Sequence, residues 1–324
     1  MQRSNCFARF SGVFLVSLLC LADALAKPSE VVRIPFELYS HHFIVVSGSL
    51  NGSPGRSLLI DTGTNPTMVD AATARELRLE KTASEDTKIN VLGGVVPSYC
   101  AVLDHLDFGL IHRDSVPVAI TDLSWAHQEI GVHIDAVVGV DVLLGATFQI
   151  DYQSKQISFG MIRVPNSAVP VTNTARFLIV QARLNGSPLN LLLDTGGSTL
   201  VLSARGLPVS LRPLAGERIK LSNLGGETFL ERVQVKELKI GKTNLGFGSA
   251  VIGEMRSDGT IQGILGISSL RFKRVTFDLA ALRVGFELQN MVAPTLQGAR
   301  AWFGSEPATY NIEPMRTPMI ASHR

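Results

Sequence analysis

The chain has 324 residues, of which 45% are hydrophobic and 18% charged, and its formal net charge is +2. This near balance of charge argues against a nucleic-acid-binding surface and against a polybasic membrane-binding surface. A content of 29 glycines together with many apolar residues is typical of short strands and tight turns around sizeable cores. Composition therefore favours a mainly β protein, and charge alone does not identify its partner.

Residues 1–26 have the pattern of a secretory signal peptide. Arg3 and Arg9 give a positive start, a short apolar stretch follows, and Ala24-Leu25-Ala26 supplies small residues at a cleavage site. We expect cleavage before Lys27, which leaves no membrane span in the mature chain. A retained membrane anchor fits less well, because the apolar stretch is too short to cross a bilayer.

Cysteine usage also fits an exported protein. Cys6 and Cys20 leave with the signal peptide, so Cys100 remains alone and the mature chain forms no internal disulfide. Cys20 is a weak candidate for lipid attachment, since the preceding Leu19 is bulkier than the residue usual at that place. An exported protein of this size without disulfides fits a bacterial periplasm.

The most informative feature of the chain is a duplicated motif. Asp61-Thr62-Gly63 and Asp194-Thr195-Gly196 each follow an apolar run, and a single such triplet would carry little weight. Their surroundings recur in the same order, however, and the recurring blocks are Asn51-Gly52-Ser53-Pro54 with Asn185-Gly186-Ser187-Pro188, Gly93-Gly94 with Gly225-Gly226, Val137-Val138-Gly139 with Ile264-Leu265-Gly266, and Asp151 with Asp278. The chain is therefore an internal duplication whose copies differ by small loop insertions.

The duplication predicts a domain organisation. An N-terminal unit at 27–162 is joined by a linker at 163–174 to a C-terminal unit at 175–288, and a proline-containing tail at 289–324 is predicted to be disordered or to lie across the body. Strands are predicted at 43–46, 58–60, 101–108, 116–120, 148–151 and 157–159, and again at 177–182, 191–193, 233–240, 250–252, 275–278 and 283–286. A helix is predicted at 71–79, with Asp70 as its N-cap.

These motifs and their order resemble the aspartic protease clan, and in particular retropepsin-like bacterial proteases with two retropepsin units in one chain. The resemblance covers residues 31–288. It implies an all-β, bilobal and pseudo-twofold fold of two β-barrel lobes. It also implies that Asp61 and Asp194 are the catalytic pair, that Thr62 and Thr195 brace the two turns, and that 137–139 and 264–266 are loops packed beneath those turns.

The chemistry of two adjacent carboxylates supports the same assignment. A close pair does not ionise twice at low cost, so it holds one proton over a wide pH range and can supply both a base and an acid. Neither a metal nor another cofactor is needed. Gly63 and Gly196 allow the sharp turns. Thr64 can donate a hydrogen bond to its neighbouring carboxylate whereas Gly197 cannot, so Asp61 is predicted to be the ionised member and the pH optimum to be acidic.

The resemblance also assigns two flaps, which are hairpins that fold over the cleft. Their tips would be Leu92, Gly93 and Gly94 in the first unit and Leu224, Gly225 and Gly226 in the second. Taken alone, either glycine pair is more simply an ordinary hairpin turn. Their matching positions after the two Asp-Thr-Gly triplets favour flaps, and the apolar neighbours predict a cleft that prefers hydrophobic side chains.

Other polar residues are given structural interpretations. His41, His42 and His105 lack the three or four converging ligands of a zinc site. His112-Arg113-Asp114 is interpreted as a turn, and Cys100 as a core residue. Asp151 and Asp278 are duplicated but lack a glycine turn, which favours a structural role.

Together these inferences predict an exported aspartic endopeptidase that acts on protein or peptide substrates as a monomer with a pseudo-dimeric site. A second hypothesis keeps the fold but not the activity: a catalytically silent or regulated peptide-binding module. Stabilisation by a transition-state mimic discriminates between the two, because it requires an assembled pair of carboxylates.

Overall fold

The computed structural model describes residues 31–289 except 83–86, 93, 175–176, 206–212, 224–225, 247, 256–258, 268–269 and 271. The predicted signal peptide and residues 290–324 of the predicted tail lie outside this part of the chain, as do Gly93, Leu224 and Gly225 of the predicted flaps. Within it, strands predominate over three short helices, which confirms the all-β fold class.

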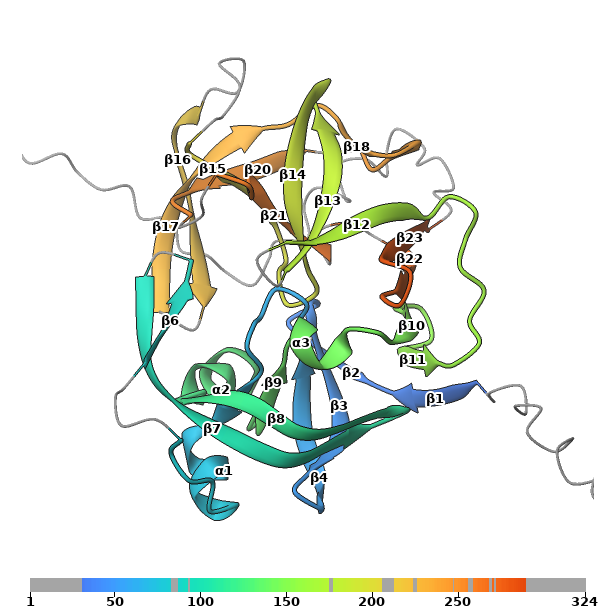
Figure 1. The fold of residues 1–324 in the computed structure, drawn as a ribbon. Helices are drawn as coiled ribbons and strands as arrows, with labels where there is room; N and C mark the ends of the chain where they lie inside the picture. Colours follow the sequence, from blue (N-terminus) through green and yellow to red (C-terminus); the bar gives the residue numbers. More distant parts are fainter. Residues whose placement is uncertain are drawn as a thin grey trace, which may run out of the picture.

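Two lobes meet at a shared sheet (Figure 1). The first half contains β1 (Val32–Pro35), β2 (Glu37–Tyr39), β3 (Phe43–Leu50), β4 (Ser53–Ile60), β5 (Met68–Asp70), α1 (Ala71–Glu76), β6 (Thr87–Val91), β7 (Gly94–Phe108), β8 (Ile111–Thr121), α2 (Ser124–Ile130), β9 (Ala136–Val138), α3 (Val140–Leu143), β10 (Thr147–Asp151) and β11 (Gln156–Phe159). The second half contains β12 (Val169–Thr174), β13 (Phe177–Leu184), β14 (Ser187–Asp194), β15 (Leu200–Ser203), β16 (Pro213–Asn223), β17 (Gly226–Gln234), β18 (Leu238–Ile240), β19 (Thr243–Asn244), β20 (Ser249–Gly253), β21 (Gly263–Gly266), β22 (Phe272–Asp278) and β23 (Arg283–Leu288).

The duplication seen in the sequence is present in the strand order. The first lobe has the order β3-β4-β9-β5-β8-β7-β6, and the second has β13-β14-β21-β15-β20-β17-β16. In each lobe the strand that leads to the aspartate, β4 or β14, pairs in parallel with β9 or β21. The two segments predicted as loops beneath the catalytic turns are therefore mainly these short strands, and that expectation was wrong. Their uniformly apolar sequence reflects burial on both faces.

Three strands from each half form the sheet shared between the lobes, in the order β1-β11-β10-β22-β23-β12. At its centre β10 and β22 pair antiparallel, with Gln149 opposite Thr276. The Gln149 side chain donates a hydrogen bond of 2.8 Å to the Thr276 hydroxyl, and Phe148 stacks on Phe277 with ring centroids 4.8 Å apart. The sheet thus fixes the two lobes to each other.

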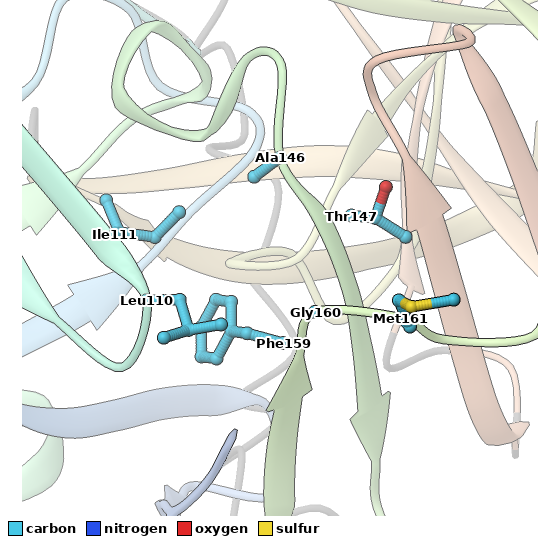
Figure 2. Close-up of a pocket in the computed structure, with 7 residues that line it drawn as sticks. All are labelled: Leu110, Ile111, Ala146, Thr147, Phe159, Gly160 and Met161. Atoms are coloured by element: carbon cyan, nitrogen blue, oxygen red, sulfur yellow. The ribbon is translucent and has the colours of Figure 1, made fainter. Parts of the chain in front are cut away.

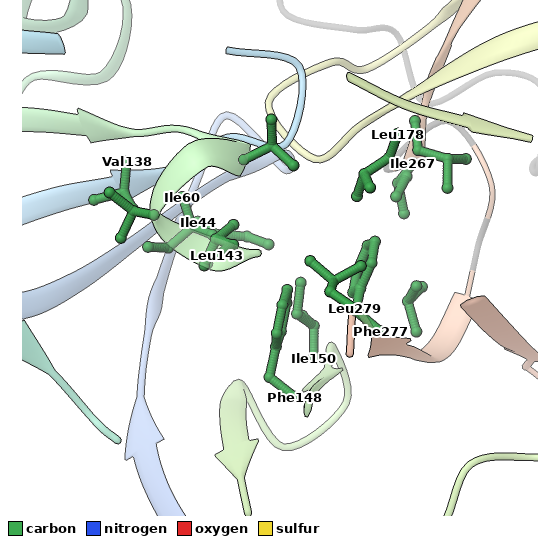
Figure 3. Close-up of a cluster of buried hydrophobic side chains, with 14 of the residues drawn as sticks. Ile44, Ile60, Val138, Leu143, Phe148, Ile150, Leu178, Ile267, Phe277 and Leu279 are labelled. Carbon is green, nitrogen blue, oxygen red and sulfur yellow. The ribbon is translucent and has the colours of Figure 1, made fainter. Parts of the chain in front are cut away.

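One hydrophobic core continues through this sheet. Figure 3 shows Ile44, Ile60 and Val138 of the first lobe, Phe148 and Phe277 of the shared sheet, and Leu178 and Ile267 of the second lobe within one cluster. Each of these side chains is at most 1% exposed. Burial of this kind stabilises a protein in proportion to the apolar area removed from water, so the relative placement of the lobes is part of the folded core.

Three local predictions differ from the structure. The last six residues of the predicted linker 163–174 form β12, which pairs with β13 and β23. The strand predicted at 233–240 is broken between β17 and β18, because the Asn185 side chain accepts hydrogen bonds from the Lys236 and Glu237 amides. The helix predicted at 71–79 has its predicted N-cap, Asp70, but ends at Glu76, and Arg78 has a φ of 56°.

Candidate active site

Two equivalent turns position the two aspartates. Asp61 follows β4 and Asp194 is the last residue of β14. The Gly63 amide donates to Asp61 Oδ1 at 2.8 Å, and the Gly196 amide donates to Asp194 Oδ1 at 2.8 Å. Each turn therefore holds its own carboxylate by the same backbone hydrogen bond.

The two turns also face each other closely. A Cβ atom added to Gly63 would lie 2.7 Å from Asp194 Cγ, and one added to Gly196 would lie 2.8 Å from Asp61 Cγ. Each glycine is thus packed against the carboxyl group of the opposite lobe, where a larger residue would clash. A hydrogen bond also joins the two carboxyl groups, so the structure brings both predicted residues into one site.

Thr62 and Thr195 connect the turns beneath the carboxylates. The Thr62 amide donates to the Thr195 hydroxyl at 3.0 Å, and the Thr195 amide donates to the Thr62 hydroxyl at 3.1 Å. The hydroxyls donate in turn to the carbonyls of Leu193 and Ile60, at 2.8 and 2.9 Å. Both threonines are fully buried, and the hydrogen bonds cross between the lobes in both directions.

The environment of the pair is asymmetric. The Thr64 hydroxyl donates to Asp61 Oδ2 at 2.6 Å, whereas a Cβ at the equivalent Gly197 would lie 2.8 Å from Asp194 Oδ2. Burial and then the neighbouring charge of Asp61 raise the pKa of Asp194 well above its ordinary value, and the backbone amides of Gly196 and Gly197 offset only part of this. Asp194 is therefore the member that retains a proton, which agrees with the asymmetry predicted from the sequence.

The duplicated glycines Gly139 and Gly266 lie against the fourth residue of each turn. A Cβ at Gly139 would be 2.5 Å from the Thr64 carbonyl oxygen, and one at Gly266 would be 2.6 Å from the Gly197 carbonyl carbon. Only glycine permits this approach, so both copies of the apolar-apolar-Gly motif support the two Asp-Thr-Gly turns directly.

One supporting interaction was missed from the sequence. Asp141 accepts hydrogen bonds from the Thr67 amide and hydroxyl, at 3.0 and 2.8 Å, and the Thr67 hydroxyl accepts from the Gly139 amide at 2.9 Å. The equivalent positions in the second half are Leu200 and Ser268. Because the combination of Thr67 and Asp141 does not recur in the second half, the repeat did not reveal this interaction.

Both predicted flaps are hairpins in the structure. In the first, Val91 pairs with Gly94, and Leu92 lies in the turn between β6 and β7. In the second, Asn223 pairs with Gly226 across β16 and β17. In these sheets β6 and β16 are terminal strands, so each hairpin presents a strand edge.

The duplicated Asp151 and Asp278 lie in the shared sheet and make structural interactions. Asp151 accepts from the Arg274 guanidinium at 2.6 Å and from the Gln153 and Ser154 amides. Asp278 accepts from the Thr147 hydroxyl at 3.2 Å. Arg113 belongs to β8 rather than to the predicted turn, and its guanidinium donates to the carbonyls of Val142 and Leu144 at the end of α3.

Other features of the described residues do not suggest a second catalytic centre. They contain no cluster of histidine, cysteine and acidic side chains suited to a metal ion, and none of their helices has the length and apolarity to cross a membrane. A pocket away from the two aspartates is lined by Leu110, Ile111, Ala146, Thr147, Phe159, Gly160 and Met161 (Figure 2). None of these side chains is an acid or a base in the physiological range, so this pocket is unsuited to proton transfer.

The comparison with protein families matches this arrangement. The model of a family described as aspartyl protease matches residues 46–148 and 180–269, one region for each lobe and together more than half of the chain. The comparison with curated proteins found no match. The chain therefore belongs to the aspartyl protease family, within the retropepsin-like clan, with two units in one polypeptide.

Proposed function

We propose that the protein is an aspartic endopeptidase in which Asp61 and Asp194 form one catalytic pair shared between the lobes. The observation that carries the proposal is the packing of each turn glycine against the carboxyl group of the opposite lobe. Two carboxyl groups must lie this close, each against the turn of the opposite lobe, if they are to bind one water molecule between them. Single-chain assembly of the pair also leads us to propose a monomeric enzyme.

The two carboxyl groups have complementary parts in the reaction. Asp61, which accepts a hydrogen bond from the Thr64 hydroxyl, takes a proton from the attacking water. Asp194, which burial keeps protonated, donates its proton to the carbonyl oxygen of the scissile peptide as the tetrahedral intermediate forms. Breakdown of that intermediate returns the first proton to the leaving nitrogen. As the carbon–nitrogen bond breaks, a hydroxyl of the intermediate gives its proton to Asp194, so Asp61 ends ionised and Asp194 ends protonated, as at the start.

The substrate that best fits the site is a protein or peptide in extended conformation. The edges of β6 and β16 can pair with the backbone of an extended chain by β-augmentation, which is independent of side-chain identity. Val95 and Phe229 on the two hairpins are 41% and 55% exposed, and they offer apolar contacts to such a chain. We further propose that the substrate is met after export, following removal of residues 1–26.

A cleavage assay with matched variants tests this proposal. Residues 27–324 are incubated with a diverse peptide library at several pH values, beside Asp61→Asn and Asp194→Asn, which are isosteric and keep the fold. We expect cleavage by the wild type and at least a 1,000-fold loss, in order of magnitude, in each variant. Folded wild type that neither cleaves any peptide nor is stabilised by pepstatin would refute the proposal and favour a silent peptide-binding module.

A further inference from the structure

The tip of the first hairpin is seated on the second lobe. Leu92 packs against the second-lobe cluster of Val201, Leu230 and Val251. A Cβ atom added to Gly253 would lie 3.2 Å from Leu92 Cδ1, so the absence of a side chain at Gly253 leaves the space that Leu92 uses. Figure 1 shows the β6–β7 hairpin reaching the near ends of β16 and β17.

The site that receives Leu92 has an equivalent in the first lobe. Val201 pairs with Val251 and Ile264 on the neighbouring strands. In the first lobe Met68 pairs in the same way with Ala119 and Val137. The two sets of three residues therefore occupy the same face of the same strands, and the lobes differ in what covers that face.

In the first lobe this face is covered by residues of the same lobe. Met68, Ala119 and Val137 belong to one buried cluster that also contains Leu123 and Ala126, at the start of α2. In the second lobe the equivalent face is divided between two clusters, with Ile264 packed against both. Ile134 follows Leu123 by 11 positions, whereas Ile261 follows Met255 by 6. The second lobe has a shorter connection at the place of α2, and Leu92 from the other lobe supplies apolar cover.

The Leu92 site lies beside the catalytic pair. Ile264 is two positions before Gly266, whose Cα lies 3.1 Å from the Cβ position of Gly197. That Cβ position is in turn 2.8 Å from Asp194 Oδ2. If the proposed function holds, an extended peptide whose scissile bond lies at the two carboxyl groups places a neighbouring side chain near this site. Because the site is apolar, only an apolar side chain replaces Leu92 there without loss of solvation.

We propose that Leu92 is a self-ligand of the second lobe. In the peptide-free protein it fills the site beside Asp194 and holds the first hairpin closed, and an apolar side chain of the incoming peptide displaces it. The displacement step rests on the proposed function, whereas the seating of Leu92 does not. Leu92 thereby opposes peptide entry and makes opening of the first hairpin depend on residues of the second lobe.

Amide hydrogen exchange of the first hairpin tests the seating without use of catalysis. Leu92→Ser removes the seated side chain, and Gly253→Val fills the site from the second lobe without altering the hairpin. Val95→Ser is the matched control, since Val95 is an exposed apolar residue of the same hairpin. We expect exchange of residues 87–98 to accelerate about tenfold in Leu92→Ser and Gly253→Val but not in Val95→Ser. Unchanged exchange in Leu92→Ser overturns the proposal whether or not Gly253→Val folds.

Binding of pepstatin, an apolar peptide mimic of the tetrahedral intermediate, tests displacement. If Leu92 competes with the ligand, its removal lowers the Kd of pepstatin, and we expect about a threefold or larger decrease in Leu92→Ser relative to the wild type. A higher Kd would overturn the proposal, because it would make Leu92 a ligand contact rather than a competitor. If no variant binds pepstatin or cleaves peptide, the proposed function and with it the displacement step fail, while hydrogen exchange still decides the seating.

Discussion

Thr62 and Thr195 each donate a backbone amide hydrogen bond to the hydroxyl of the other, across the boundary between the lobes. Because both residues are fully buried, water does not replace these hydrogen bonds when one partner is lost. The two turns are therefore held at a fixed separation, and the carboxyl groups of Asp61 and Asp194 with them. Positioning of this kind is what allows two carboxyl groups to act on one water molecule.

Removal of one threonine hydroxyl should destabilise the folded protein. Thr62→Val leaves the buried Thr195 amide and the Leu193 carbonyl without their partners, each at a cost of about 1–3 kcal/mol. We expect Tm, measured by calorimetry, to fall by several degrees and cleavage to fall with it. Thr64→Val is the control, since the Thr64 hydroxyl bonds to Asp61 at the cleft. An equal loss of Tm in both variants would contradict a special role for the interlobe hydrogen bonds.

The raised pKa of Asp194 predicts how stability changes with pH. The folded chain keeps a proton on Asp194 above pH 3.8, the ordinary pKa, where the unfolded chain releases it. The free energy of unfolding therefore decreases as pH rises through the window between 3.8 and the raised pKa. Asp194→Asn should remove this decrease and have a higher Tm than the wild type at neutral pH. A difference in Tm between Asp194→Asn and the wild type that stays constant from pH 3 to pH 8 would contradict the raised pKa of Asp194.

Asp151 should show the opposite dependence. Burial raises the pKa of Asp151, but the Ser154 amide and the Arg274 guanidinium more than offset this, so the net shift is downward. Its stabilising contribution is present above pH 3.8 and is lost as pH falls through the lowered pKa. Asp151→Asn should lower Tm at neutral pH, with a destabilisation of about 1–3 kcal/mol, and should converge with the wild type in acid.

Asp151→Asn should not affect catalysis, because Asp151 lies in the shared sheet. We expect kcat of Asp151→Asn and of the matched Asp278→Asn to stay within about twofold of the wild type at a temperature where all three are folded. A loss of kcat comparable to that of Asp61→Asn would show that the wrong duplicated aspartates have been assigned to catalysis.

The proposed export makes a prediction about the mature chain. Protein recovered from the exported fraction should begin at Lys27, as determined by intact mass. Ala26→Phe places a bulky residue at the cleavage position and should leave the precursor uncleaved, because signal peptidases require small residues there. An exported wild-type chain whose mass includes residues 1–26 would contradict this expectation.

Features that recur in both halves were predictable from the sequence. The two Asp-Thr-Gly triplets, the Asn-Gly turns and the positions of both hairpins follow from the repeat, and each is present in both lobes. Strands of three or four residues that are wholly apolar, such as β9 and β21, carry no alternation and were missed as strands.

Features that depend on contacts between distant segments were not predictable. Asn185 ends a strand some 50 positions away, Asp141 supports a turn through Thr67, and Leu92 is seated on the opposite lobe. The Asn185 contact has a counterpart in the first lobe, where Asn51 accepts from the His105 amide, but neither asparagine shows its distant partner in the local sequence. Each follows from how the lobes pack rather than from a local pattern.

The measurement that bears most directly on a pair shared within one chain is complementation between inactive variants. Asp61→Asn and Asp194→Asn are purified separately, mixed in equal amounts across a range of concentrations, and assayed on a peptide that the wild type cleaves. If both carboxyl groups must come from one chain, the mixture should be as inactive as either variant alone. Activity that appears on mixing and rises with the square of concentration would show that the site forms between two chains, and would contradict the single-chain pair.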